Sequence, residues 1–417
     1  MKILQVNQYY YPRGGADKYF LDLSESLKKA GHEVAVFSME HPKNLETPYS
    51  KYFVSRVSFN NQSLKDKIKT PGRVLYSLEA KRKFTKLLED FKPDIIHCHN
   101  IYHHLSPSIL DAAKKKHIPV VMHLHDYELI CPNHLLFTKG HYCEACRPNK
   151  YQACIRNKCV KNSYSGSALA AFEMYLHHSV LKIYEKNINL FIAPSNFLKN
   201  TVVSFGHDPR QIEVVYNPHN LGTAEPNQNE INKNNPVAPV SYYLYFGRLS
   251  EEKGLDILIQ AANKSKQKII IAGSGYEEEK LKKIVKDLNA PIDFIGFKTG
   301  SELIAIIRQA QAIIIPSIWA ENMPLSLLEA LSLNKVVIVS NIGGMPEVIK
   351  DNENGLLFET GNCNELAAKI DYLNSLEPDK RLLLEKRAGE TAQLFSAEKN
   401  LEAIINIYKK LTKTAAE

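Results

Sequence analysis

The chain has 417 residues, 44% of them hydrophobic, which is too long for one ordinary domain and suits two globular domains of about 200 residues each. Its formal net charge is +8, and the positive excess lies in the first 200 residues, whereas the remainder is slightly acidic. No uninterrupted apolar run reaches the roughly 18 residues of a membrane span, and the N-terminus resembles a strand more than a signal peptide, so we expect a cytoplasmic protein.

Strands and helices alternate along the chain, which is typical of a parallel sheet covered by helices on both faces. The first domain is predicted at residues 1–200, with a basic, irregular and partly helical segment at 40–92. One continuous helix is expected from about 166 to 187, and another after Ser195, which suits an N-cap. The predicted strands of this domain cover residues 3–6, 32–38, 94–99, 120–125 and 190–193.

Two glycines, Gly14 and Gly15, follow the first predicted strand. They permit the backbone to approach a ligand at the carboxyl edge of the sheet, where open α/β sheets bind, although a tight turn alone explains them equally well. The loop lacks the Gly-x-Gly-x-x-Gly pattern, which makes a nicotinamide-binding first domain improbable.

Histidines end two later strands of this domain. Because side chains alternate along a strand, we predict that His97 and His99 share one face and that His123 and His125 share another. Only the terminal member of each pair, His99 or His125, is expected to reach a ligand, and Asp126 follows directly. We predict that His97 and His123 are core residues.

Residues 127–165 interrupt the alternation and hold five of the seven cysteines. A Cys-x-x-Cys pair followed by further cysteines, in a chain without a secretion signal, is typical of structural zinc held by thiolates rather than of disulfides. Five candidates for four positions leave the ligand set open, and an iron–sulfur cluster or buried thiols remain alternatives. The candidates are Cys131, Cys143, Cys146, Cys154 and Cys159.

The second domain is predicted at residues 201–395, and a C-terminal helix at 396–417. A strand is expected at 212–216, and the polar residues 221–239 are predicted to form a linker or exposed loop. The other strands expected in this domain cover residues 242–247, 268–273, 292–296, 312–316, 336–340 and 355–358.

The most informative stretch, residues 316–333, leads from a strand into an apolar helix. Pro324 is predicted as the first helical residue, because its missing N–H costs nothing there. The unpaired amides from Met323 to Ser326 would attract phosphate. Glu321 in the loop and Glu329 in the helix are pure acceptors suited to sugar and ribose hydroxyls. Two glutamates eight residues apart are common, however, so this stretch alone is weak evidence.

Two further motifs accompany this stretch. Tyr245-Phe-Gly-Arg-Leu-Ser-Glu-Glu-Lys-Gly254 ends a strand and presents Arg248 and Lys253 in a glycine-bounded turn, and Ile342-Gly-Gly-Met-Pro-Glu347 follows a later strand. Together the three motifs resemble the donor site of the family-4 retaining glycosyltransferases of GT-B fold, and the resemblance extends over nearly the whole chain. Asn217-Pro-His-Asn220 departs from that family's more frequent Asn-Gly-Val-Asp and puts the hinge contacts in doubt.

The resemblance implies two Rossmann-like doubly wound domains that face each other across a cleft, with the last helix crossing back to the first domain. It also implies transfer of a hexosyl group, with retention, from a nucleoside diphosphate sugar to a glycan or lipid-linked acceptor in cell-surface polysaccharide synthesis. No Asp-x-Asp metal motif stands in a fitting position, so we expect no cofactor for catalysis. No first-domain carboxylate stands out as a nucleophile, which favours front-face transfer.

Residue roles follow from the same resemblance. Arg248 and Lys253 would bind the diphosphate and stabilise charge on the leaving group. His125 would contact the reacting centre opposite Glu321, and Glu329 would bind ribose. The other donor-binding residues are Gly14, Gly15, Ser274, Phe297, Asn322, Met323, Pro324 and Leu325, and the acceptor-side residues are His99 and Asp126.

Basic clusters of the first half suit anionic lipid headgroups or an acidic acceptor, although solvated helix faces explain each cluster as well. Nucleic acid is a weaker candidate, because the basic runs lack interleaved aromatic residues. Two alternatives to a transferase remain, a nucleotide-sugar epimerase of the same fold and a noncatalytic nucleotide-sugar-binding subunit. The clusters comprise Lys65, Lys67, Lys69 and Arg73, then Lys81, Arg82 and Lys83, then Lys114, Lys115 and Lys116.

Overall fold

The computed structural model describes residues 1–56, 72–219 and 241–414. Within this part the chain forms two compact units. The first comprises Met1–Thr138, Cys143–Val215 and the chain from Asn400 onward, and the second comprises Lys139–Tyr142 and Tyr216–Lys399. The predicted linker at 221–239 and Lys65, Lys67 and Lys69 lie outside the described residues.

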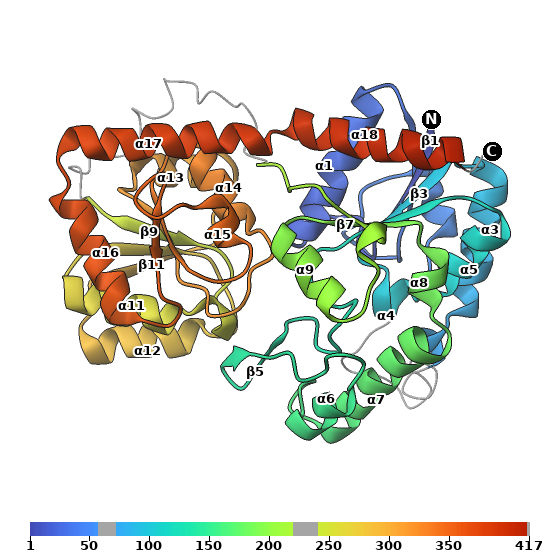
Figure 1. Cartoon of the computed structure of the whole chain (residues 1–417), viewed down its shortest axis with the longest axis horizontal. Helices are drawn as coiled ribbons and strands as arrows, with labels where there is room; N and C mark the ends of the chain where they lie inside the picture. Colours follow the sequence, from blue (N-terminus) through green and yellow to red (C-terminus); the bar gives the residue numbers. More distant parts are fainter. Residues whose placement is uncertain (57–71, 220–240, 415–417) are drawn as a thin grey trace. The chain divides into compact units, whose positions relative to one another are not determined.

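The first unit contains a parallel six-stranded sheet in the order β2-β1-β3-β4-β7-β8 (Figure 1). The order changes direction between β1 and β3, so the loops after these two strands diverge at a topological switch point, where open α/β sheets bind ligands. The strands are β1 (Lys2–Val6), β2 (Glu33–Phe37), β3 (Ile95–Cys98), β4 (Val120–His123), β7 (Leu190–Ala193) and β8 (Ile212–Val214).

Helices complete the first unit, and the C-terminal helix belongs to its core. Tyr408 and Ile404 of the last helix pack with Ile3 of β1 and Tyr19 of the first helix, all of them buried. The helices are α1 (Gly15–Lys29), α3 (Leu78–Phe91), α4 (Tyr102–Leu105), α5 (Ser108–Lys115), α6 (Gln152–Asn157), α7 (Tyr164–Met174), α8 (Ile183–Asn187), α9 (Asn196–Ser204) and α18 (Ala397–Thr414), with short turns η1 (Pro48–Tyr52), η2 (Tyr175–Val180) and η3 (Pro209–Gln211).

Two predictions about this unit are wrong. The helix expected at 166–187 is α7 followed directly by the π-helical turn η2, and it is interrupted before α8, where Lys182 adopts a left-handed conformation with φ of 50°. The predicted domain boundary after residue 200 falls inside α9. The following strand, β8, pairs with β7 in the first sheet, so this unit extends to Val215.

The second unit contains a parallel sheet in the order β11-β10-β9-β12-β13-β14, the Rossmann order, with its switch point between β9 and β12. Both sheets therefore have the predicted doubly wound form. The strands are β9 (Tyr243–Phe246), β10 (Ile269–Ala272), β11 (Ile292–Gly296), β12 (Ile313–Ile315), β13 (Val337–Ser340) and β14 (Leu356–Phe358). The helices are η4 (Glu251–Lys253), α11 (Leu255–Ser265), α12 (Glu278–Leu288), α13 (Gly300–Gln309), α14 (Leu325–Ser332), α15 (Met345–Val348), α16 (Cys363–Ser375), α17 (Pro378–Ala392) and η5 (Gln393–Phe395).

The cysteine-bearing segment has little regular structure. It contains α6 and the two-stranded sheet of β5 (Phe137–Thr138) and β6 (His141–Tyr142). Among the described residues, no helix combines the length and apolar character needed to cross a membrane.

Candidate active site

The loop after β9 is folded back on itself and lies beside the loop after β10. The Tyr245 hydroxyl donates to the carbonyl oxygen of Arg248 at 2.7 Å, and the Leu249 amide donates to the carbonyl of Ser274 at 3.0 Å. The Arg248 and Ser274 side chains are exposed. An anionic ligand at this edge of the sheet therefore has access to a guanidinium and a hydroxyl.

The loop after β9 also touches the loop after β12, across the switch point. Gly254 has φ of +65°, and a Cβ there would lie only 2.2 Å from the carbonyl oxygen of Pro316. The Ile318 amide donates to the carbonyl of Glu252 at 3.0 Å. Glycine is thus required at 254 both for the left-handed conformation and for the close approach.

This approach creates a buried ion pair between the two loops. Lys253 Nζ lies 2.6 Å from Glu321 Oε1, with side-chain exposures of 17% and 7%. The Ser317 hydroxyl donates to the same carboxylate oxygen at 2.7 Å, and the ammonium lies over the Trp319 ring. Burial raises the pKa of Glu321, but the charge of Lys253 and the hydrogen bonds outweigh it, so the pKa is lowered overall. The carboxylate is therefore ionised at neutral pH.

A third loop supports Glu321 from the other side. Gly344 donates its amide to the backbone carbonyl of Glu321 at 2.7 Å. Ser317, Gly343 and Gly344 were not among the predicted site residues. The signal was present for all three, because the glycines belong to the Ile342–Glu347 motif and Ser317 lies in the stretch 316–333, but Ser317 was not given a role.

Helix α14 begins one residue later than predicted. Pro324 is its N-cap, with φ of −70° and ψ of 128°, and Leu325 is the first helical residue. Glu329 lies one turn into this helix and is half-buried. Met323 is buried in the apolar core, so its backbone and not its side chain is available to a donor. Asn322 is also buried.

Phe297 follows β11 and is 72% exposed. An aromatic ring exposed at the carboxyl edge of a sheet offers a stacking surface for a planar base.

The contacts among the loops after β9, β10 and β12 bring four predicted residues onto adjacent loops of the second unit. These residues are Arg248, Lys253, Ser274 and Glu321.

In the first unit, Gly14 is the N-cap of α1 and Gly15 its first residue, and both are exposed. Gly14 has an extended backbone that any residue can adopt, with φ of −155°. Asn7 stabilises the loop by donating from Nδ2 to Asp17 Oδ1 and to the carbonyl of Tyr9, each at 2.8 Å. Gly14 and Gly15 thus lie in the loop between β1 and α1, and the backbone sets no conformational requirement for glycine at 14.

The four histidines form one row on a single face of the sheet, which corrects the prediction of two faces. β3 and β4 pair in parallel with His97 opposite Val121, so odd-numbered residues of both strands point the same way. Ring centroids lie 4.4 Å apart for His97 and His99, and 4.6 Å apart for His123 and His125. His97, His99 and His123 are fully buried, and His125 is half-buried.

Hydrogen bonds join the row to its surroundings. His99 Nδ1 lies 2.9 Å from His125 Nε2, and His99 Nε2 lies 2.9 Å from Gln5 Oε1. The Tyr408 hydroxyl lies 2.6 Å from His97 Nδ1. Burial lowers the pKa of His125 to about 3, so its ring is neutral at physiological pH and acts through hydrogen bonds rather than through charge.

The buried histidines predict loss of stability in acid. Burial lowers the pKa of His97 to about 3 from the ordinary value of 6.5, so between these values the unfolded chain binds more protons than the folded one. Stability is then complete above pH 6.5 and falls as the pH decreases, by about 1.4 kcal/mol per pH unit for each such histidine. Urea unfolding of the wild type at pH 7, 6, 5 and 4 measures this slope.

The variant His97→Asn should take up about one proton fewer on unfolding in acid, because it removes one such histidine. The free energy of unfolding should therefore depend less steeply on pH than in the wild type. His117→Asn, at an exposed position, should leave the slope unchanged. Equal slopes for the wild type and His97→Asn would contradict the neutral buried histidine.

In the first unit, Asp126 lies near a charged cluster formed by His103, Glu128 and Glu173. Its Oδ1 accepts the Glu128 amide at 2.9 Å, and burial raises its pKa to about 6. His103 Nδ1 lies 2.8 Å from Glu128 Oε1, and its Nε2 lies 3.2 Å from Glu173 Oε2. The two carboxylates outweigh burial and raise the pKa of His103 well above its ordinary value. Sequence reasoning did not predict this cluster, because its members are far apart in the chain.

Two places in the described residues have side chains that suit a metal. The five cysteines of the segment 127–165 line one cavity. One histidine-carboxylate group, His178, Glu185 and His207, has ligand atoms all within 4.8 Å of one another.

Comparison with known proteins assigns the family. The model described as "Glycosyltransferase Family 4" matches residues 13–222, half of the chain, and the model "Glycosyl transferases group 1" matches residues 226–395. The chain belongs to Glycosyltransferase Family 4. The two matched regions contain the histidine row and the Lys253–Glu321 pair, respectively.

Relatives and a solved structure agree with this family. An uncharacterized glycosyltransferase of Methanocaldococcus jannaschii, MJ1607, is 26% identical over 98% of both chains. The O-antigen chain mannosyltransferase C of Escherichia coli is 22% identical over 99% of both chains. The crystal structure of Anabaena HepE in complex with UDP is 19% identical, covers 98% of this chain and 100% of its own, and has a TM-score of 0.67. This likeness shows the GT-B fold that the sequence predicted.

Proposed function

We propose that this glycosyltransferase transfers a hexosyl group, with retention of configuration, from a nucleoside diphosphate sugar to a glycan or lipid-linked acceptor of a cell-surface polysaccharide. The observation that carries the proposal is the buried Lys253–Glu321 pair at the switch point of the second sheet, with the exposed Arg248 on the same loop as Lys253. The O-antigen name of one full-length relative and the UDP bound to HepE are consistent with it.

The chemistry follows from the charges on these loops. As the bond from the sugar to the diphosphate breaks, its electron pair passes to the diphosphate oxygen, and Arg248 and Lys253 stabilise the growing negative charge. The Glu321 carboxylate and the amides before α14 hold the sugar and phosphate, and Glu329 holds the ribose. The acceptor oxygen attacks from the face that the diphosphate leaves and gives its proton to the departing oxygen. Neutral His125 orients a hydroxyl by hydrogen bonding.

A lipid-linked acceptor, and peripheral contact with an anionic membrane, are supported by an exposed apolar surface in the first unit. Phe172 on α7 and Tyr175 on η2 are each 52% exposed, and Val180 at the end of η2 is 53% exposed. Some lysines of the predicted basic clusters pair with acids instead, as Lys81 does with Asp111 and Lys116 with Glu89. The apolar surface is therefore the better support for membrane contact.

A donor screen tests the proposal. Calorimetric titration with UDP-, GDP-, ADP- and dTDP-sugars should show selective binding of one base, with slow release of the nucleotide. Arg248→Ala and Glu329→Ala should each weaken that binding by about tenfold or more, because each removes a charge-assisted hydrogen bond. Binding of none of these donors would contradict the proposal.

Matched controls separate the site from general damage. Arg308→Ala on α13 and Glu353→Ala, both exposed and outside these loops, should leave donor affinity unchanged.

Product analysis distinguishes the alternative functions. An epimerase would release an altered nucleotide sugar without an acceptor, and a noncatalytic subunit would bind the donor without turnover.

A further inference from the structure

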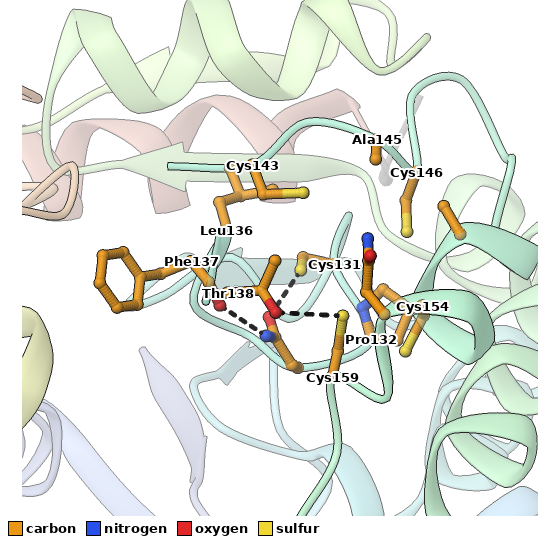
Figure 2. A pocket seen from close by; sticks show the side chains of 13 residues that line it. Cys131, Pro132, Leu136, Phe137, Thr138, Cys143, Ala145, Cys146, Cys154 and Cys159 are labelled. Atoms are coloured by element: carbon orange, nitrogen blue, oxygen red, sulfur yellow. Dashed lines mark hydrogen bonds between the residues drawn. The ribbon is translucent and has the colours of Figure 1, made fainter. Parts of the chain in front are cut away.

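The cysteine-bearing segment encloses a small cavity lined by five thiols. Cys131, Cys143, Cys146, Cys154 and Cys159 surround it (Figure 2). None of them forms a disulfide. The cavity has a volume of about 10 Å³, which leaves room for a single small occupant. A four-iron cluster would need more space than this.

Three of the cavity thiols form hydrogen bonds with neighbouring oxygen atoms. Cys131 Sγ donates to Asn133 Oδ1 at 2.9 Å, and Cys159 Sγ donates to Thr138 Oγ1 at 3.8 Å. Cys154 Sγ donates to the carbonyl oxygen of Ser167 at 3.9 Å. A sulfur that binds a metal loses this proton and acts as a thiolate.

The regular structure around the cavity consists of short elements only. β5 and β6 have two residues each, and α6 has six. Short segments of this kind usually depend on disulfides or a structural metal, and thiols without disulfide partners favour the metal.

We propose that this cavity binds one zinc ion through four of the five thiolates, with Cys146, Cys154 and Cys159 among them. Each ligand loses its S–H proton to solvent and forms a Zn–S bond of about 2.3 Å, which places tetrahedral sulfurs about 3.8 Å apart. No three of the sulfurs lie within 4.8 Å of one another in the described residues, so binding contracts the cavity. Zinc therefore fixes the segment and takes no part in sugar transfer.

Zinc content of the full-length protein tests this inference. Protein purified without chelator, or reduced and reconstituted with zinc sulfate and then desalted, should contain about one zinc per chain by inductively coupled plasma mass spectrometry. The double variant Cys154→Ser with Cys159→Ser leaves three of the five cavity thiols and should retain less than about a tenth of that amount, because three thiolates bind zinc far less tightly than four. Cys363→Ser and Cys98→Ser are the matched controls outside the cavity and should retain it fully.

A second measurement serves if the serine variants fail to fold. Stepwise titration of the folded wild type with a mercurial thiol reagent, in the presence of a colorimetric zinc chelator, should release about one zinc per chain as the cavity thiols react. This readout needs no sugar donor. It therefore fails or succeeds independently of the proposed transferase function.

Three results would overturn the inference. The first is protein that holds no zinc after reconstitution. The second is iron with acid-labile sulfide in place of zinc. The third is retention of zinc by the double cysteine variant together with its loss in His207→Ala, which would place the ion at His178, Glu185 and His207 instead.

Discussion

Replacing Lys253 with methionine is expected to lower the rate of sugar transfer about 100- to 1,000-fold, because the variant loses a cation that stabilises the leaving diphosphate. The same change should lower the free energy of unfolding by about 3 kcal/mol, since it leaves the Glu321 carboxylate buried without its partner. Steady-state kinetics with the donor identified by the screen, and urea unfolding, measure the two effects.

A double variant separates the two roles. Lys253→Met with Glu321→Gln should recover most of the lost stability, because the neutral amide needs no counter-ion, while transfer stays as slow as in the single variant. Lys282→Met, which removes a lysine paired with Glu278 on the exposed surface of α12, should leave both stability and transfer unchanged. Full activity in the double variant would show that the pair is only structural.

Replacing Gly343 with alanine is expected to displace Glu321 and to destabilise the second unit by about 3 kcal/mol. Gly343 has φ of +68°, and a Cβ there would lie 2.3 Å from the backbone carbonyl oxygen of Glu321. The left-handed conformation costs about 1–2 kcal/mol for alanine, and the overlap with a fixed backbone adds a packing cost of similar size. Because the displaced residue belongs to the donor site, donor affinity should fall as well.

Gly361→Ala is the control for the backbone conformation alone. Gly361 has φ of +79°, but no atom lies within 4 Å of its Cβ position. This variant should therefore lose only about 1 kcal/mol and keep its donor affinity. Equal losses of stability in the two variants, with donor binding intact in both, would show that contact with Glu321 has no role.

The sequence alone was sufficient to predict the strands of the two parallel sheets and the class of fold. Apolar runs such as Ala312–Ile315 and Val336–Val339 are continuous because strands of a parallel sheet are buried on both faces, and this pattern is local. The glycine-bounded turn at 247–254 and the loop before α14 were also recognised, because together with the motif at 342–347 they resemble the donor site of the family. Arg248, Lys253 and Glu321 could therefore be named as candidates from the sequence.

Only the tertiary structure decided which candidates act together. Lys253 and Glu321 are 68 residues apart, and their 2.6 Å contact exists because β9 and β12 are neighbours in the sheet. The register of β3 and β4 put the four histidines on one face, although alternation within each strand was predicted correctly. Likewise, spacing alone could not show that Cys131 lines the same cavity as Cys159. The physical reason is the same in each case. The alternation of side chains along a strand is a property of one segment, whereas strand register and strand order depend on packing between segments that are distant in the chain.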